Sequence, residues 1–184
     1  MDGPLWKVLG FFLAAVLLFL VPVLYMLERQ DSIAYTVVFT ETNRFADAAR
    51  DTGYITPEMY NDFVRRLNAT GCTFEIHIQH LRTMVIPVYR EKGQTSEFTG
   101  EYEVVRISQG EDAILSVLFP DDSSADEHDK SRRYEMKAGD LLFVEVRNKG
   151  KTMATALRDM MLFTDTKTPT LFVRAGGLVR NEAY

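Results

Sequence analysis

The chain has 184 residues, of which 26 are acidic and 21 basic, and its formal net charge is −5 at pH 7. It contains no basic block and no stripe of alternating basic and aromatic residues, so we do not expect nucleic acid as a partner. Its one cysteine, Cys72, excludes an intramolecular disulfide. We expect Cys72 to be a small buried residue in a strand, and an exported thiol that links two copies is the alternative.

The first element is an apolar stretch from Leu5 to Leu27, interrupted by one charged residue, Lys7. A hydrocarbon core about 30 Å thick needs roughly 20 apolar residues of helix, which residues 8–27 supply. No small-x-small cleavage site follows, so an uncleaved anchor is favoured over a removed signal sequence. The sequence predicts a single-pass protein of the cell membrane, with a short cytoplasmic N-terminus and an extracellular C-terminal head.

Small residues in this span predict where partner helices pack. Helices in lipid associate through close backbone approach, because no hydrophobic force drives them together there. Gly10, Ala14 and Ala15 lie on neighbouring turns and are the predicted packing residues. Pro22 removes one backbone hydrogen bond, so we expect it to bend the outer part of the helix.

The chain between Leu27 and Gly53 has neither glycine nor proline, which predicts that the membrane helix continues as an amphipathic stalk. The face of this stalk repeats every three or four residues: Ala34, Val38, Thr42, Phe45 and Ala49. The alternative is a strand over 35–40, which is rich in β-branched and aromatic residues. No turn residues flank that run, so the helix is favoured. Gly53 then ends the helix with a left-handed cap. We therefore predict an anchor over 1–28, a helical stalk over 29–53 and a head over 54–184.

The first half of the head predicts a helix followed by extended segments. Thr56 and Pro57 form an N-terminal helix signal, and Gly71 ends that helix. Alternating polarity predicts a strand from Cys72 to Gln79, and further extended segments are expected over 84–89 and 98–107. Pro87 indicates an edge position, and the pair Val104–Val105 indicates a bulge.

The second half predicts a short helix over 112–119, a turn over 137–140, a strand over 141–146, a helix capped by Thr152 and a strand over 171–173. The apolar residues of the Thr152 helix follow a 3.6-residue period: Met153, Ala156, Leu157, Met160 and Met161. The order of elements predicts an α+β fold, in which a long N-terminal transmembrane and amphipathic helix precedes a small, mostly antiparallel sheet packed with short helices.

Few residues are suited to catalysis. His77 and His80 are three apart on a predicted strand and point to opposite faces, so they do not form a metal pair. The acidic run 121–129 lacks the ligand register of a calcium loop, so we expect a solvated loop. Gly176–Gly177 predicts a turn without a following helix, and hence no phosphate cradle. We expect no catalytic residue, no metal and no cofactor, and a membrane-tethered enzyme is the least favoured alternative.

The layout resembles a type IV pilin or pseudopilin: a short N-terminal segment, an apolar helix with Pro22, an amphipathic continuation and an α+β head. More closely, the segments 53–60, 100–103 and 151–155 resemble small clostridial membrane-anchored proteins associated with tight-adherence (Tad-like) pilus or secretion systems. The resemblance implies an assembly role without catalysis. The partners that it implies are the membrane, other pilin-like or secretion-machine subunits, and further copies of the chain.

A prepilin is cut after a glycine and usually carries a glutamate at the fifth position of the mature helix. The matching bond here is Gly10–Phe11, and the fifth residue after it is Ala15. Cleavage at this bond is one hypothesis, and the alternative is that Gly10 lets another helix approach. Two other functions remain open: a static, uncleaved component of a secretion or conjugation machine, and a surface binding or sensing module.

Overall fold

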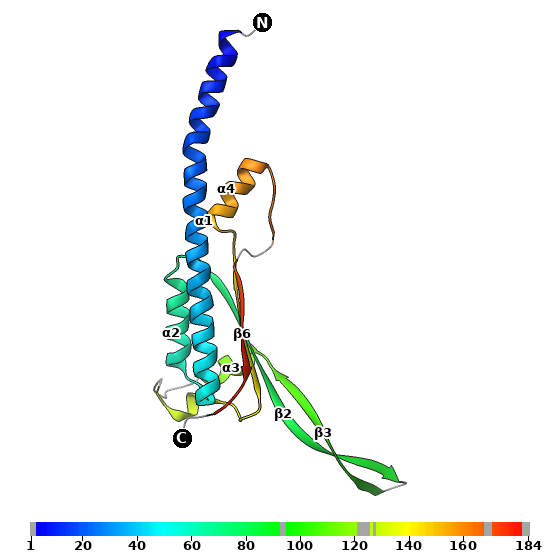
Figure 1. Ribbon diagram of the computed structural model, residues 1–184. Coiled ribbons are helices and arrows are strands. Elements are labelled where there is room, and N and C mark those ends of the chain that lie inside the picture. Colours follow the sequence, from blue (N-terminus) through cyan, green and yellow to red (C-terminus); the bar gives the residue numbers. More distant parts are fainter. Residues whose placement is uncertain (1–2, 93–94, 121–125, 127, 168–170, 182–184) are drawn as a thin grey trace.

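The computed structural model describes residues 3–92, 95–120, 126, 128–167 and 171–181. Its longest element is helix α1 (Pro4–Thr52), which extends well beyond the head at its N-terminal end (Figure 1). Pro4 occupies the first turn, and Gly53 ends the helix at φ 76°, with its N–H donating to the Ala49 carbonyl at 3.0 Å. The helix continues through residues 35–40, so the predicted helix is confirmed over the alternative strand.

The head is the predicted α+β fold. Its main sheet is antiparallel, in the order β3-β2-β5-β6, and a two-stranded sheet pairs β1 with β4. The remaining elements are β1 (Tyr54–Ile55), α2 (Pro57–Asn68), β2 (Phe74–Lys92), β3 (Thr95–Gln109), α3 (Glu111–Leu118), η1 (Lys130–Arg132), β4 (Tyr134–Glu135), β5 (Leu141–Asn148), α4 (Met153–Leu162) and β6 (Phe172–Leu178). Thr56 and Thr152 cap α2 and α4 through their side chains, as predicted.

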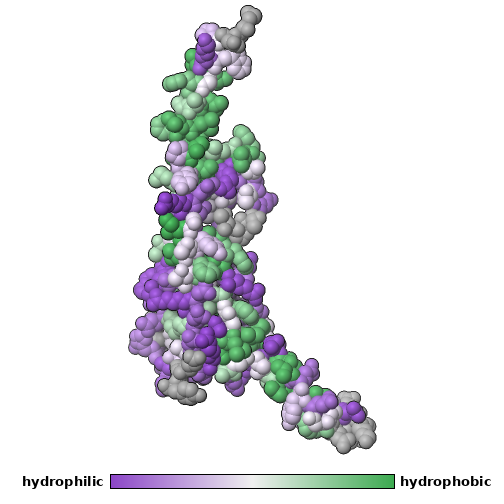
Figure 2. Space-filling model, in the orientation of Figure 1, coloured by the Kyte–Doolittle hydropathy of each residue, from purple (hydrophilic) through white to green (hydrophobic). Residues whose placement is uncertain are grey.

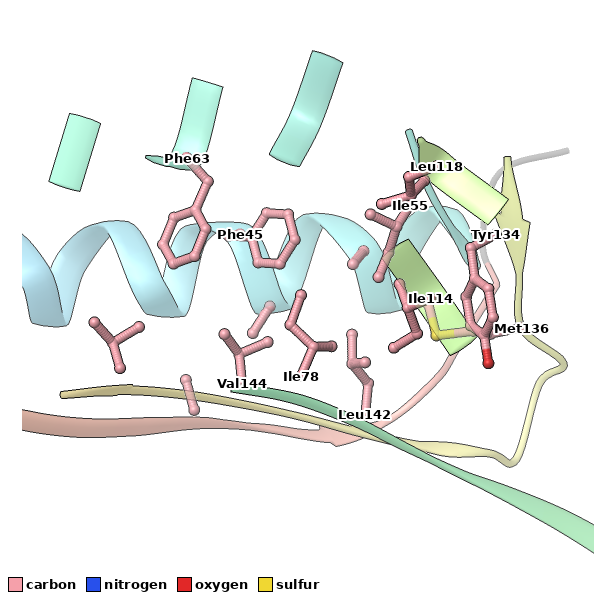
Figure 3. Close-up of a cluster of buried hydrophobic side chains, with 14 of the residues drawn as sticks. Phe45, Ile55, Phe63, Ile78, Ile114, Leu118, Tyr134, Met136, Leu142 and Val144 are labelled. Carbon is pink, nitrogen blue, oxygen red and sulfur yellow. The ribbon is translucent and has the colours of Figure 1, made fainter. Parts of the chain in front are cut away.

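The core forms where the C-terminal half of α1 lies between α2 and the sheet (Figure 3). The predicted face of α1 is the buried one: Ala34, Val38, Thr42, Phe45 and Ala49. Phe45 stacks on Phe63 of α2, with ring centroids 4.5 Å apart, and β2 and β5 contribute Ile78, Leu142 and Val144 from the other side. The part of the helix predicted as a stalk therefore supplies one wall of the core, which joins the head rigidly to the apolar N-terminal half.

The end of α1 is attached to β6. Arg50 donates from Nε to the Leu178 carbonyl at 2.9 Å, and its own carbonyl accepts from the N–H of Arg180. The prediction of a turn at Gly176–Gly177 was wrong, because both glycines lie within β6 at φ 148° and 151°. A Cβ atom on Gly176 would stand 2.1 Å from the Leu142 carbonyl oxygen, so glycine permits the close approach of β5 and β6.

Strand β2 is longer than predicted. The two extended segments expected over 72–79 and 84–89 are one strand of 19 residues. Its first part pairs with β5 up to Leu81, and the rest pairs with β3 from His80 onward. The two partners overlap, so the backbone continues without a turn. The bulge expected at Val104–Val105 is instead a register shift between Pro87 and Tyr89, where Pro87 has no N–H to donate.

Candidate functional site

The N-terminal half of α1 is an exposed apolar surface. Among the described residues it forms the one helix that is long and apolar enough to cross a membrane, and none of its most apolar window is buried within the structure. Phe11 and Phe19 are 79% and 74% exposed. Figure 2 shows this half as a hydrophobic column above the head. Such a surface is stable in lipid or against other apolar helices, since each large side chain left in water costs about 1.5–3 kcal/mol.

The predicted packing residues lie on this half of α1. Gly10, Ala14 and Pro22 are exposed and Ala15 is half-buried. Gly10 and Ala14 are one turn apart and share a face of the helix. A Cβ atom at Gly10 would meet nothing within 4 Å, so the isolated chain has room for a larger residue there. The Gly10–Phe11 bond lies inside the regular helix.

A second exposed apolar surface lies at the opposite end of the molecule, where β2 and β3 leave the sheet as a hairpin (Figure 1). We call residues 82–92 and 95–107 the hairpin arm. Its exposed large apolar side chains are Met84, Val85, Ile86, Tyr89, Phe98, Tyr102, Val104 and Ile107. Phe98 contacts both Tyr89 and Tyr102, with ring centroids 5.8 and 5.4 Å apart. Cross-strand pairs such as Val85–Val104 bring apolar residues together without covering them.

The arm also has unpaired edges. Pairing of β2 with β5 ends at Leu81, and among the described residues no strand pairs with the outer edge of β3. Unpaired strand edges with apolar faces are typical protein-contact surfaces. One pattern in the sequence distinguishes the arm from a half-buried strand, although its pair Val104–Val105 was interpreted as a bulge. Apolar residues occupy consecutive positions at 84–86 and 104–105, whereas a half-buried strand alternates.

A buried polar network sits where the arm leaves the sheet. His80 lies between Tyr134 and Asp140: its Nδ1 is 2.8 Å from the Tyr134 hydroxyl and its Nε2 is 3.0 Å from Asp140 Oδ2. The Asp140 carboxylate also accepts the N–H of Thr83 at 2.8 Å and that of Lys137 at 2.9 Å. Thr83 is the second residue of β2 beyond its pairing with β5. The network therefore fixes the backbone at the base of the arm.

The electrostatics of this network follow from its hydrogen bonds. Burial raises the pKa of Asp140, but the N–H groups of Thr83 and Lys137 and the His80 ring outweigh burial and hold that pKa below its usual value. Burial raises the pKa of the Tyr134 hydroxyl. An ionised carboxylate only accepts, so Nε2 of His80 donates to Asp140.

This network borders a hollow of about 640 Å³, lined mainly by polar side chains. Both ring nitrogens of His80 are already engaged within the protein, and the His80 side chain is 4% exposed. A general base needs a nitrogen within reach of substrate. The arrangement is therefore suited to holding the arm in place rather than to proton transfer.

The other candidate residues are apart from one another. His77 is exposed, on the opposite face of β2 from His80, and its Nδ1 lies 3.2 Å from Glu111. Burial raises the pKa of Glu111, and the neighbouring His77 partly offsets this rise. In the described part of the chain, no three His, Cys, Asp or Glu side chains gather as a metal site. Residues 121–125 and 127 of the acidic run lie outside the described residues. Cys72 is half-buried, and burial, followed by the charge of Asp31, raises its pKa.

No protein-family model, curated protein or solved structure matches this chain. Its own architecture combines three features that bear on function: an exposed apolar helix, a head that shares this helix, and an apolar hairpin arm.

Proposed function

We propose that the chain is a membrane-anchored, pilin-like or pseudopilin-like subunit of a bacterial pilus or secretion assembly. It acts through packing and not through catalysis. The N-terminus is cytoplasmic, α1 crosses the cell membrane, and the head is extracellular. One observation carries the proposal: a single unbroken helix is apolar and exposed over its N-terminal half and forms part of the core of the head over its C-terminal half.

This arrangement connects the membrane to the head without a flexible linker. A helix of 49 residues is about 70 Å long. Its C-terminal end is attached to β6 through Arg50, and its buried face packs against the sheet. Displacement of the apolar half therefore moves the head as one body. A subunit that is inserted into or extracted from a membrane assembly needs such a rigid connection.

Contacts between subunits are assigned to the two exposed apolar surfaces. In the membrane, Gly10 and Ala14 allow a neighbouring helix to approach closely. At the far end of the head, the hairpin arm offers apolar faces and unpaired edges to another subunit of the assembly. The two surfaces lie at opposite ends of the molecule, as expected of a subunit that contacts its neighbours both in the membrane and outside it.

A static component of a secretion or conjugation machine is the second candidate, and Ala15 favours it. A prepilin cut after Gly10 would normally carry a glutamate at this position, which would register one subunit against the next. An uncleaved component has no such requirement.

The N-terminus of the native protein distinguishes these two functions. Mass spectrometry is applied to the membrane fraction and to material sheared from the surface of a bacterium that expresses the chain. A start at Phe11 in the sheared material supports a processed, filament-forming subunit. An intact Met1 confined to the membrane supports the static component, and a protein recovered only in the soluble fraction would refute both.

The packing claim has its own test. Ala14→Leu adds bulk to an exposed position, so we expect normal insertion but reduced crosslinking between subunits in the membrane. Val23→Phe adds bulk on the opposite face of the same helix and is the matched control. Unchanged crosslinking in Ala14→Leu, or an equal loss in both variants, would contradict packing through the Gly10–Ala14 face.

A further inference from the structure

Helix α4 turns its apolar face away from the head. The 3.6-residue period predicted from the sequence is present, but the buried residues of α4 are Ala154, Thr155 and Asp159. The large apolar side chains are exposed: Met153 (74%), Met160 (71%), Leu162 (62%) and Phe163 (97%), the last at the C-cap. A helix of a water-soluble head normally buries its apolar face. The outer face of α4 therefore requires a separate explanation.

Polar bonds on the inner face hold α4 in this orientation. Asp159 accepts from Lys151 Nζ at 2.5 Å and from the N–H and hydroxyl of Thr166 at 2.9 and 2.7 Å. The Lys151 ammonium, followed by the bonds from Thr166, holds the pKa of Asp159 well below its usual range. The Thr152 hydroxyl, which also caps α4, lies 2.5 Å from Asp31 of α1. Rotating the apolar face inward would break these bonds.

The same contacts show which way α4 runs. Thr152, before its first turn, contacts Asp31, whereas Arg158, farther along α4, pairs with Glu28. Helix α4 thus advances toward the N-terminal end of α1 (Figure 1). Phe163 lies about 7.5 Å beyond Arg158 along the α4 axis, at 1.5 Å per residue. Glu28 is the first charged residue after the apolar stretch that ends at Leu27. The end of α4 therefore reaches the level of the last apolar turns of the span.

Two further observations fit a lipid environment at this level. In Figure 2 the end of α4 is hydrophobic and stands beside the hydrophobic column of α1, with hydrophilic residues below both. Phe163 has a left-handed backbone, at φ 52° and ψ 40°, where glycine is the usual cap residue. Its ring is almost fully exposed, so packing within the chain does not offset this backbone cost. Phenylalanine is typical of the apolar face of helices that lie at a membrane interface.

We propose that the outer face of α4 is a second membrane contact, through which Met160 and Phe163 enter the interfacial layer of the bilayer that α1 crosses. The inference rests on the proposed anchor. Lipid is the occupant because the patch lies at the level of the span and next to it, where the bilayer that surrounds α1 begins.

This contact restrains the head. A single rigid helix can still tilt in the membrane and rotate about its own axis, and the head moves with it. A second contact beside α1 removes much of this freedom and fixes the direction in which the hairpin arm projects.

Quenching of tryptophan by brominated lipids tests the contact in the full-length protein. Trp6, the single tryptophan, reports on the anchor in the native chain. In a Trp6→Phe background, Phe163→Trp reports on the end of α4, and Tyr102→Trp on the arm is the control far from the membrane. Met160→Trp repeats the α4 measurement at a regular helical position. Each protein is reconstituted into phosphatidylcholine–phosphatidylglycerol vesicles with bromine near the interface.

We expect the brominated lipids to cause a loss of fluorescence for Trp6 and for the indoles at positions 160 and 163, but not for the indole at position 102, because bromine quenches only indoles that reach the interfacial layer. Quenched Trp6 with unquenched indoles at both α4 positions would overturn the second contact and leave the anchor intact. Equal quenching at position 102 would also overturn it, since the head would then lie on the membrane without preference for α4. Unquenched Trp6 would overturn the anchor itself, and the inference with it.

Discussion

Replacing Asp140 by alanine should loosen the base of the hairpin arm and destabilise the head. The carboxylate is 2% exposed and accepts bonds from the N–H groups of Thr83 and Lys137 and from His80. Alanine would leave one buried donor, the His80 ring, and two partly buried N–H groups without an acceptor, at about 1–3 kcal/mol for each donor that water does not reach. Partial relaxation and entry of water reduce the sum, so we expect a loss of about 3–5 kcal/mol, the usual cost of removing one partner from a buried pair.

Hydrogen exchange followed by mass spectrometry measures this loss directly, because it gives the free energy of opening for peptides of β2 and β5 in the full-length protein. A loss of this size corresponds to roughly 100- to 5,000-fold faster exchange. Asp140→Asn retains the shape but turns an amide donor toward backbone N–H groups, so we expect a smaller loss of about 1–3 kcal/mol. Asp47→Ala removes an ion pair whose carboxylate is 56% exposed and should change the opening free energy by less than about 0.5 kcal/mol.

The reasoning would be refuted if Asp140→Ala changed the opening free energy by less than about 1 kcal/mol, or by no more than Asp47→Ala. Faster exchange confined to the far end of the arm would also contradict it. The network is argued to hold the junction of the arm with the sheet, and not its tip.

Three further outcomes are expected. The folded-state pKa of Asp140 lies below the usual value of about 3.9, so the contribution of this carboxylate to stability is complete above that pH and is lost as pH falls through the folded pKa. The opening free energy should therefore fall more steeply in acid for the wild type than for Asp140→Asn, and equal slopes would contradict this. Gly176→Ala places a Cβ atom 2.1 Å from a backbone oxygen of β5 and should lower the free energy of unfolding by about 3 kcal/mol or more, measured as a lower melting temperature. In the control Gly150→Ala the new Cβ atom meets nothing within 4 Å, so this variant should have little effect. The double substitution Val85→Ser and Val104→Ser alters an exposed cross-strand pair, so it should change stability by about 1 kcal/mol or less but reduce copurification of assembly partners. Unchanged copurification would exclude this face of the arm as a contact surface.

Much of the fold was predictable because local patterns determine it. The apolar run, the absence of helix breakers before Gly53 and the period of Val38, Phe45 and Ala49 were sufficient to predict α1 and its buried face. Thr56 and Thr152 marked the starts of α2 and α4, because a cap depends on residues a few positions away. The α+β class followed from the order of the elements.

The predictions that were wrong depend on contacts between segments that are distant in the sequence. Gly176 and Gly177 are typical turn residues, and they lie in a strand because β5 and the side chain of Arg50 approach them closely. Strand β2 continues through the expected break because β3 takes over pairing where β5 ends. Neither reason is visible in the local sequence, since both partners lie far along the chain.

The sequence by itself determined that one long helix carries an apolar half and an amphipathic half, because hydropathy and periodicity are properties of neighbouring residues. Only the tertiary structure decided which apolar residues remain uncovered. Periodicity shows that α4 has an apolar face, but bonds from Thr152 to Asp31 and from Lys151 to Asp159 turn that face outward. The arm is exposed because the pairing of β2 with β5 ends at Leu81. His80 meets Asp140 only because β2 pairs with β5. Exposure depends on contacts between distant segments, and those contacts exist only once the chain has folded.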